Sequence, residues 1–131
     1  MLMEEVQPLV AAHLTGRILH SALQVHQALG PGLLESTYRT CLLRAMERDG
    51  LAARSEVALP IEFQGVVIPS AYRADIVVDS QVIVELKSVE RLLPIHEAQI
   101  LTYMKLAKVR IGLLLNFNVR RLQHGIRRYI R

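Results

Sequence analysis

The chain of 131 residues lacks the marks of several common protein classes. Its single cysteine, Cys41, excludes an intrachain disulfide and an all-cysteine zinc or iron–sulfur site within one chain. No apolar run approaches the roughly 20 residues that a membrane span needs. The N-terminus carries Glu4 and Glu5 and lacks the basic-then-apolar pattern of a secretion signal. We therefore expect a cytoplasmic protein with no membrane partner.

Several catalytic patterns are also missing. There is no His-x-x-x-His zinc pattern, and Gly30-Pro31-Gly32 lacks the Gly-Lys-Ser/Thr that completes a phosphate-binding loop. No Ser–His–Asp elbow, internal repeat, linker or low-complexity segment is visible. With 51% apolar residues the chain can form a core, so we expect one domain over residues 1–131 and assign no organic cofactor site.

Acidic residues are absent after Glu97, although the net charge of the whole chain is only +4. Eight basic residues follow: Lys105, Lys108, Arg110, Arg120, Arg121, Arg127, Arg128 and Arg131. This asymmetry is typical of a surface that faces a polyanion, and the alternative is an ordinary solvated face. The candidate nucleic-acid contacts are Arg73, Lys105, Arg120, Arg121, Arg127 and Arg128.

Hydrophobic periodicity predicts an α/β protein. Apolar residues at helical spacing indicate helices over about 13–29, 33–49 and 94–108. Extended segments are expected at 55–63 and 66–68, in a hairpin over 72–87, and at 109–117 and 126–130. This order favours a mixed sheet flanked by helices.

Three charged residues interrupt the apolar segments of the predicted hairpin. Asp75 lies in Ala74–Val78, and Glu85 and Lys87 lie in Val82–Lys87. Charges in such strands are costly unless they are paired or bind a metal. If residues 79–81 form a three-residue loop, Asp75 opposes Glu85 and both lie on one face, with Lys87 further along it. A two-residue loop would place the carboxylates on opposite faces.

Two carboxylates on one face suit Mg²⁺ or Mn²⁺, which prefer oxygen ligands and keep several waters. A bound cation would activate water and stabilise the charge that develops on a phosphodiester, and Lys87 would assist. The alternative is a salt-bridged cluster at a sheet edge. The pattern therefore indicates a metal site that cuts phosphodiesters, with a purely structural domain as a rival.

Two predicted helices carry further candidates. Gly32, Glu35 and Tyr38 are spaced by three, although Glu35 near a helix N-terminus also has a dipole explanation and Tyr38 alone favours a core role. Gln99 and Tyr103 lie one turn apart on one face. They could hold a ligand carboxylate and contact a phosphate backbone, or they form the polar edge of an amphipathic helix.

Several short motifs, taken in their order along the chain, resemble those of one protein family over about residues 13–130. Gly32–Tyr38 fits the Gly-x-x-Glu-x-x-Tyr signature of the bacterial GxxExxY proteins. The accompanying words are Val25–Gly32, Tyr72–Asp75, Val84–Lys87, His96–Gln99 and Leu115–Asn118. That family is placed in the PD-(D/E)XK nuclease-like superfamily. The resemblance implies a restriction-endonuclease-like core, a mixed sheet flanked by helices in αβββαβ order.

The resemblance also implies roles. The superfamily motif corresponds to Asp75 and Glu85-Leu86-Lys87, with Ala74 where proline often stands. Its helix glutamate corresponds to Glu35, and Gln99 with Tyr103 resembles the Gln-x-x-x-Tyr motif of the RecB-like branch. The expected catalytic set is Glu35, Asp75, Glu85, Lys87, Gln99 and Tyr103, and the expected metal set is Glu35, Asp75, Glu85 and the carbonyl of Leu86.

These observations favour a Mg²⁺- or Mn²⁺-dependent nuclease acting on DNA. The alternative within the same fold is a non-cutting nucleic-acid-binding module or a subunit of a DNA-processing complex. A homodimer is a further expectation, because a small nuclease that cuts both strands often pairs two sites.

Overall fold

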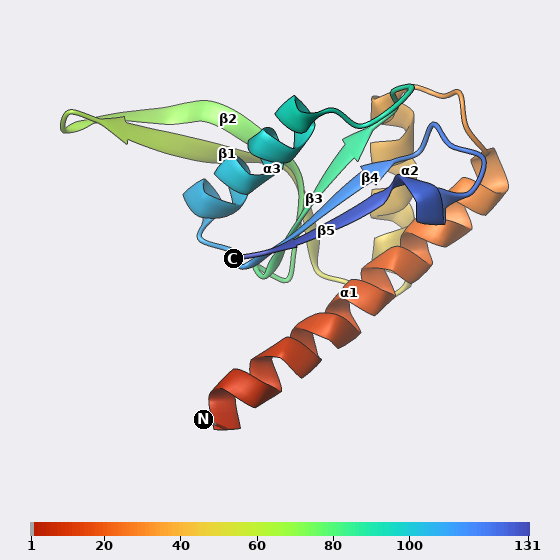
Figure 1. Cartoon of the computed structure of the whole chain (residues 1–131), viewed down its shortest axis with the longest axis horizontal. Helices are drawn as coiled ribbons and strands as arrows, with labels where there is room; N and C mark the ends of the chain where they lie inside the picture. The colour runs from red at the N-terminus through yellow and green to blue at the C-terminus, as the bar shows by residue number, and fades with distance from the viewer. Residues whose placement is uncertain (1) are drawn as a thin grey trace.

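The computed structural model describes residues 2–131, with side chains from residue 12 onward. A five-stranded sheet has α1 and α2 on one face and α3 on the other (Figure 1). The elements are α1 (Leu2–Leu29), α2 (Glu35–Arg48), β1 (Ala53–Phe63), β2 (Val66–Val78), β3 (Val82–Lys87), α3 (Pro94–Ala107), β4 (Ile111–Asn116), a 3₁₀ turn η1 (Leu122–Gly125) and β5 (Ile126–Ile130). The predicted mixed sheet flanked by helices is confirmed, and the order contains the expected αβββαβ succession.

The strands lie in chain order, β1-β2-β3-β4-β5. β3 and β4 run parallel, and every other neighbouring pair is antiparallel. A parallel pair needs a crossover, and α3 supplies it between β3 and β4. The sheet is therefore mixed, with its one parallel pair at its centre.

The core has two layers because the central strands are buried on both faces. One layer joins α1 and α2 to side chains such as Ile76, Val84 and Leu113. The other lies beneath α3 and contains Val77, Ile83 and Leu114. Adjacent β-residues point to opposite faces, so their alternation between these clusters follows from strand geometry.

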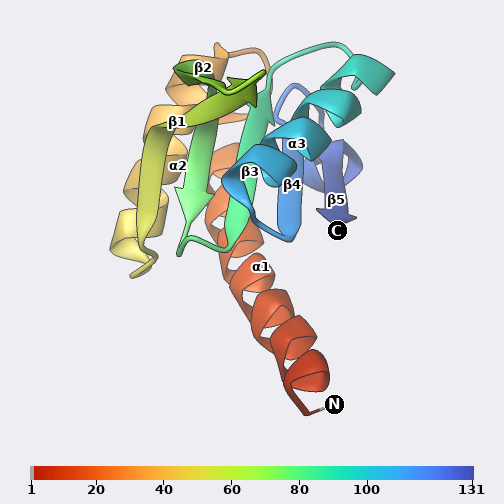
Figure 2. The ribbon, with the colours of Figure 1, turned by 90° about the vertical axis from the view of Figure 1, so that its left-hand side faces the viewer.

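The hairpin of β1 and β2 extends beyond the sheet (Figures 1 and 2). We call residues 57–74 of this hairpin the arm. β2 is one strand, whereas the sequence predicted two extended pieces. Its pairing with β1 shifts between Leu59↔Tyr72 and Ile61↔Ile68, so three residues of β2 oppose Pro60. Pro69 lies in this irregular stretch, as expected for a residue that cannot donate to a ladder.

The first helix also differs from the prediction, because α1 begins at Leu2 rather than near residue 13. Its N-terminal turns extend past the ends of the strands (Figure 2). Within residues 2–131, none of the helices combines the length and the hydropathy that crossing a bilayer requires.

Candidate active site

The three-residue loop that the metal hypothesis requires is present between β2 and β3. Val78 pairs with Val82 and Ile76 with Val84, so continued register places Asp75 opposite Glu85. Asp79 and Ser80 take left-handed backbone conformations, with φ of 52° and 54°, which turn the chain. The register that the metal hypothesis requires is therefore correct.

β2 and β3 separate at Asp75 and Glu85. The backbone N–H of Asp75 donates to Oε1 of Glu85 at 2.9 Å. In return, the backbone N–H of Leu86 donates to Oδ2 of Asp75 at 2.9 Å. Two carboxylates thus accept hydrogen bonds that carbonyls would accept in a continuous ladder. We call this place the fork, and it brings the two acidic side chains side by side.

The pleat of β2 is interrupted at the fork. Ala74 and Val77 both pack beneath α3, whereas Ile76 packs toward α1 and α2. Strict alternation would place Ala74 with Ile76. On β1, the residue opposite Asp75 is Glu56, whose φ is 49°. This irregularity lets Asp75 contact groups on α2 while it remains bonded to β3.

The α2 partner of Asp75 is Arg39, which the sequence analysis missed. Its guanidinium lies 3.6 Å from Oδ1 of Asp75 and 3.6 Å from Oε1 of Glu56. A possible signal was the spacing of four between Glu35 and Arg39, which places both on one side of the helix. Arg39 thereby supplies the counter-charge that the metal-free Asp75 needs.

Glu85 is the most perturbed acid of the site. Only 3% of the residue is exposed. Burial, followed by the charge of Asp75, raises the pKa of the Glu85 carboxyl to about 8. Both effects disfavour a second negative charge in a place that water hardly reaches. In the absence of a cation, Glu85 therefore carries a proton at neutral pH.

A hydrogen bond to a residue of α3 holds the side chain of Lys87. Its Nζ donates to Oε1 of Gln99 at 2.9 Å, and Nε2 of Gln99 donates to the hydroxyl of Tyr103 at 3.1 Å. Burial raises the pKa of the Tyr103 hydroxyl, which therefore stays protonated. The stripe predicted from the spacing of Gln99 and Tyr103 faces the fork strands, so it is not merely the polar edge of the helix.

Glu35 does not join the two acids of the fork. It is exposed at the first residue of α2, one turn before Arg39. Among residues with described placement, no group of three or more His, Cys, Asp or Glu is close enough to hold a metal ion. The predicted four-ligand set is therefore only partly assembled: Asp75 and Glu85 meet, and Leu86 contributes its N–H to the fork.

Tyr38 is a core residue, which is the role that the sequence favoured for this tyrosine taken alone. It is fully buried and stacks on Phe117, with ring centroids 4.6 Å apart. Its hydroxyl donates to the carbonyl of Gly30 at 2.5 Å and accepts from the N–H of Leu33 at 3.2 Å. Tyr38 therefore fixes the loop that leads into Glu35.

A buried amide fixes the segment that follows Lys87. Asn116, at the end of β4, is 2% exposed. Its side chain accepts from the N–H of Val89 at 3.1 Å and donates to the carbonyl of Val89 at 2.9 Å. Ser88 Oγ also donates to the carbonyl of Leu33 at 2.6 Å, which ties this segment to the loop before α2. The sequence analysis assigned no role to either side chain.

The predicted nucleic-acid contacts do not form one face. All six candidates are exposed: Arg73, Lys105, Arg120, Arg121, Arg127 and Arg128. Arg127 opposes Leu114, which packs beneath α3, whereas Arg128 opposes Leu113 on the α1–α2 side. The positive charge of the tail is therefore divided between the two faces of the sheet.

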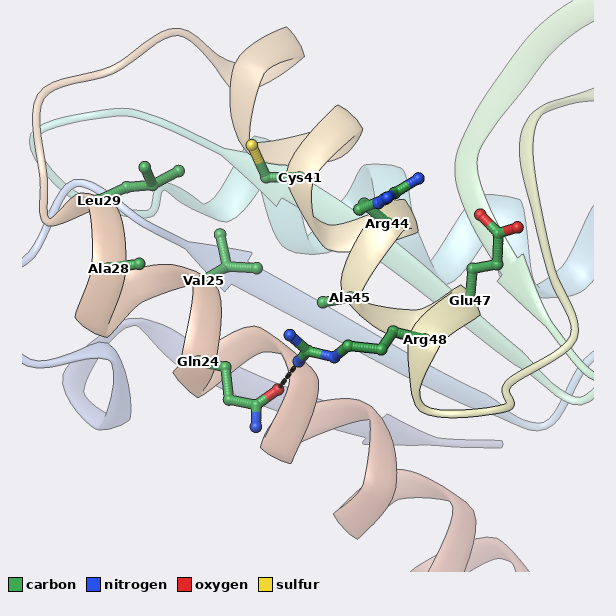
Figure 3. Close-up of a pocket in the computed structure, with 9 residues that line it drawn as sticks. All are labelled: Gln24, Val25, Ala28, Leu29, Cys41, Arg44, Ala45, Glu47 and Arg48. Carbon is green, nitrogen blue, oxygen red and sulfur yellow. Dashed lines mark hydrogen bonds between the residues drawn. The ribbon is translucent and has the colours of Figure 1, made fainter.

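A pocket of the described residues lies away from the fork. A pocket of about 710 Å³ between α1 and α2 is lined by apolar side chains, Cys41 and the charged residues Arg44, Glu47 and Arg48 (Figure 3). None of the predicted catalytic residues lines it. The fork is therefore separate from this pocket.

Comparison with known proteins supports the interpretation of the fork. The model of the PD-(D/E)XK nuclease superfamily matches residues 12–129, nearly the whole chain. Searches of curated proteins and of solved structures gave no significant match. The superfamily indicates nuclease activity and a nucleic-acid substrate, while the narrower GxxExxY assignment stays a prediction. From its fold and this match, the chain belongs to the PD-(D/E)XK nuclease superfamily.

Proposed function

We propose that this protein is a Mg²⁺- or Mn²⁺-dependent nuclease that hydrolyses phosphodiester bonds in DNA. It would be a GxxExxY-type member of the superfamily, with residues 1–131 acting as one domain. The observation that carries the proposal is the meeting of Asp75 and Glu85 at the fork, with Lys87 held nearby by Gln99.

The donors of the fork fit a hard divalent cation. Asp75 and Glu85 offer carboxylate oxygens, which Mg²⁺ and Mn²⁺ prefer. The burial of Glu85 beside a second acid is unfavourable for two anions, and a dication would relieve it. The proposed ligand set also includes the carbonyl of Leu86 and Glu35, although Glu35 does not join the fork in this structure. When bound, the cation would activate a water molecule and stabilise negative charge on the phosphate.

The chain's own residues would orient the reactants. Lys87 offers an ammonium group whose donors can contact the attacking water or a phosphate oxygen. Gln99 fixes the position of that group, and its bond to Tyr103 orders the amide. Tyr103, of which 7% is exposed, would contact the nucleic-acid backbone through its hydroxyl. Arg39 balances Asp75 before the cation arrives.

One observation favours a second candidate, a non-cutting nucleic-acid-binding module or subunit. Arg39 already pairs with Asp75, and no third acidic group of the described chain joins the fork. In such a protein the guanidinium of Arg39 would take the place of a cation beside Asp75. The fork would then bind no metal, and the protein would bind nucleic acid without cutting it.

A cleavage assay separates the two candidates. Linear, circular, single-stranded and branched DNA and RNA would be incubated with Mg²⁺, Mn²⁺ or EDTA. We expect metal-dependent cleavage that is lost in Asp75→Ala and kept in Asp79→Ala, which removes an exposed carboxylate from the neighbouring loop. Binding without cleavage in any metal would support the module instead, and cleavage that survives in Asp75→Ala would contradict the role of the fork.

The expected homodimer stays a prediction. Sedimentation of the free chain and of its DNA complex would test it, and a single-chain mass in both would contradict it.

A further inference from the structure

An exposed aromatic side chain lies beside Tyr103. Tyr72 is 43% exposed, and the centroid of its ring lies 5.6 Å from that of Tyr103, with an angle of 45° between the planes. Tyr103 is bonded to Gln99, which holds Lys87. Tyr72 is thus the surface end of the chain of contacts that begins at Lys87. The proposed catalytic roles leave it without a function.

The face of the arm that carries Tyr72 continues outward as an apolar band. Tyr72 opposes Leu59, which is buried beneath α3, so this face is the α3 side of the arm. Beyond it Ile61 pairs with Ile68, and Phe63 pairs with Val66 near the tip. Phe63 lies four residues beyond Leu59, about 13 Å along the strand.

The side chains of this band are unusually exposed for their type. Phe63 is 66% exposed, Val66 63% and Ile68 48%. A soluble protein rarely presents large apolar groups together without a partner. The band begins at the proposed cleavage site, so a partner that reaches the site can cover it.

Unpaired nucleotides match the chemistry of the band. Bases stack on aromatic faces whatever their sequence, and their phosphates need cations nearby. Two exposed cations belong to the neighbouring segments: Lys105 lies on α3, and Arg73 follows Tyr72 in β2 with its side chain on the opposite face of the arm. Glu62 is the one acidic residue of β1 within the arm, and strand alternation places its side chain on the face opposite the apolar band. A fully paired duplex keeps its bases stacked internally and has no free ring faces to offer.

We infer that Tyr72 stacks on an unpaired base beside the scissile phosphate, so that the site takes single-stranded or frayed nucleic acid. This inference rests on the proposed function for the position of the scissile phosphate. The base-stacking contact itself depends only on the arm. Phe63 provides a second stacking position further along the same strand.

Binding in EDTA tests the inference without cleavage. Fluorescence anisotropy of the full chain would use a short single-stranded oligonucleotide and a blunt duplex of the same length. We expect Tyr72→Leu to weaken single-strand binding about tenfold and duplex binding by less than about twofold. Tyr72→Phe should bind like the unaltered protein. Val67→Ala is the matched control, because Val67 is exposed on the opposite face of the arm.

Leucine preserves an apolar contact with Tyr103, and equal melting temperatures of the variants would show that they fold. Equal losses on both probes, or no loss, would overturn the inference. A second result would also overturn the inference. If sedimentation showed that Tyr72→Leu and Phe63→Ser turn a dimer into monomers while nucleic-acid binding is unchanged, the band would be an interface between two copies of the chain. Tyr72-dependent binding without cleavage of any substrate would support the stacking and refute the nuclease. Cleavage at the same rate in Tyr72→Leu and in the unaltered protein would support the nuclease and refute the stacking.

Discussion

Replacing Glu85 by Gln tests the electrostatics of the fork in the absence of metal. The substitution keeps an oxygen that can accept from the N–H of Asp75, and it removes the ability to ionise. In the folded chain the pKa of Glu85 is raised from 4.5 to about 8. The folded state therefore holds a proton, between these pH values, that the unfolded state has released.

The sign of the effect on stability follows from that proton. Where the folded state binds more protons than the unfolded state, the free energy of unfolding falls as the pH rises. The contribution of Glu85 is complete below its unfolded pKa of 4.5 and is lost as the pH rises through about 8. Each pH unit inside this window is worth about 1.4 kcal/mol, so raising the pH from 5.5 to 7.5 removes roughly 3 kcal/mol.

Urea unfolding in EDTA, followed by circular dichroism across this pH range, measures the effect. Other groups titrate as well, so the informative quantity is the difference between the unaltered chain and Glu85→Gln. We expect that difference to change by roughly 3 kcal/mol in favour of the variant as the pH rises. Parallel pH profiles of the two proteins would refute the claim that Glu85 is buried with a proton.

Three other predictions follow from single contacts. Lys87→Ala should lower single-turnover cleavage by roughly a hundredfold or more while DNA binding and melting temperature stay unchanged, and cleavage near the original rate would refute its role. Tyr38→Phe should lower the free energy of unfolding in urea by about 1–3 kcal/mol, because two backbone groups lose their partner; an unchanged midpoint would contradict this. Arg127→Ala should reduce the slope of log binding constant against log salt concentration by about 0.9 if that side chain contacts a phosphate, whereas an unchanged slope would remove it from the interface.

The register of the fork could be predicted only as a condition on the length of the loop. A three-residue loop places Asp75 opposite Glu85, whereas the apolar residues on both faces of these strands fit either register. The contact between Gln99 and Tyr103 follows from helical spacing, since the two residues share a face, whereas the bond from Lys87 to Gln99 was not predicted. Local periodicity therefore accounts for part of the site.

The contact between Arg39 and Asp75 was not predictable, because it depends on an exception to the alternation of side chains along a strand. It requires an interrupted pleat at Asp75 and a left-handed glutamate at position 56, and composition signals neither. The continuity of β2 was missed for a related reason, since Pro69 indicates an interruption that the strand absorbs as an irregularity. The division of positive charge could have been foreseen, because Arg127 and Arg128 are neighbours in a strand.

Calorimetric titration of Mn²⁺ into the metal-free protein tests the central claim most directly, because it needs no substrate. At pH 7, in two buffers of different ionisation enthalpy, we expect binding at the fork with release of about one proton from Glu85. That binding should disappear in Asp75→Asn and persist in Asp79→Asn. Identical Mn²⁺ binding in the unaltered chain and in Asp75→Asn would show that the two carboxylates of the fork do not hold the metal.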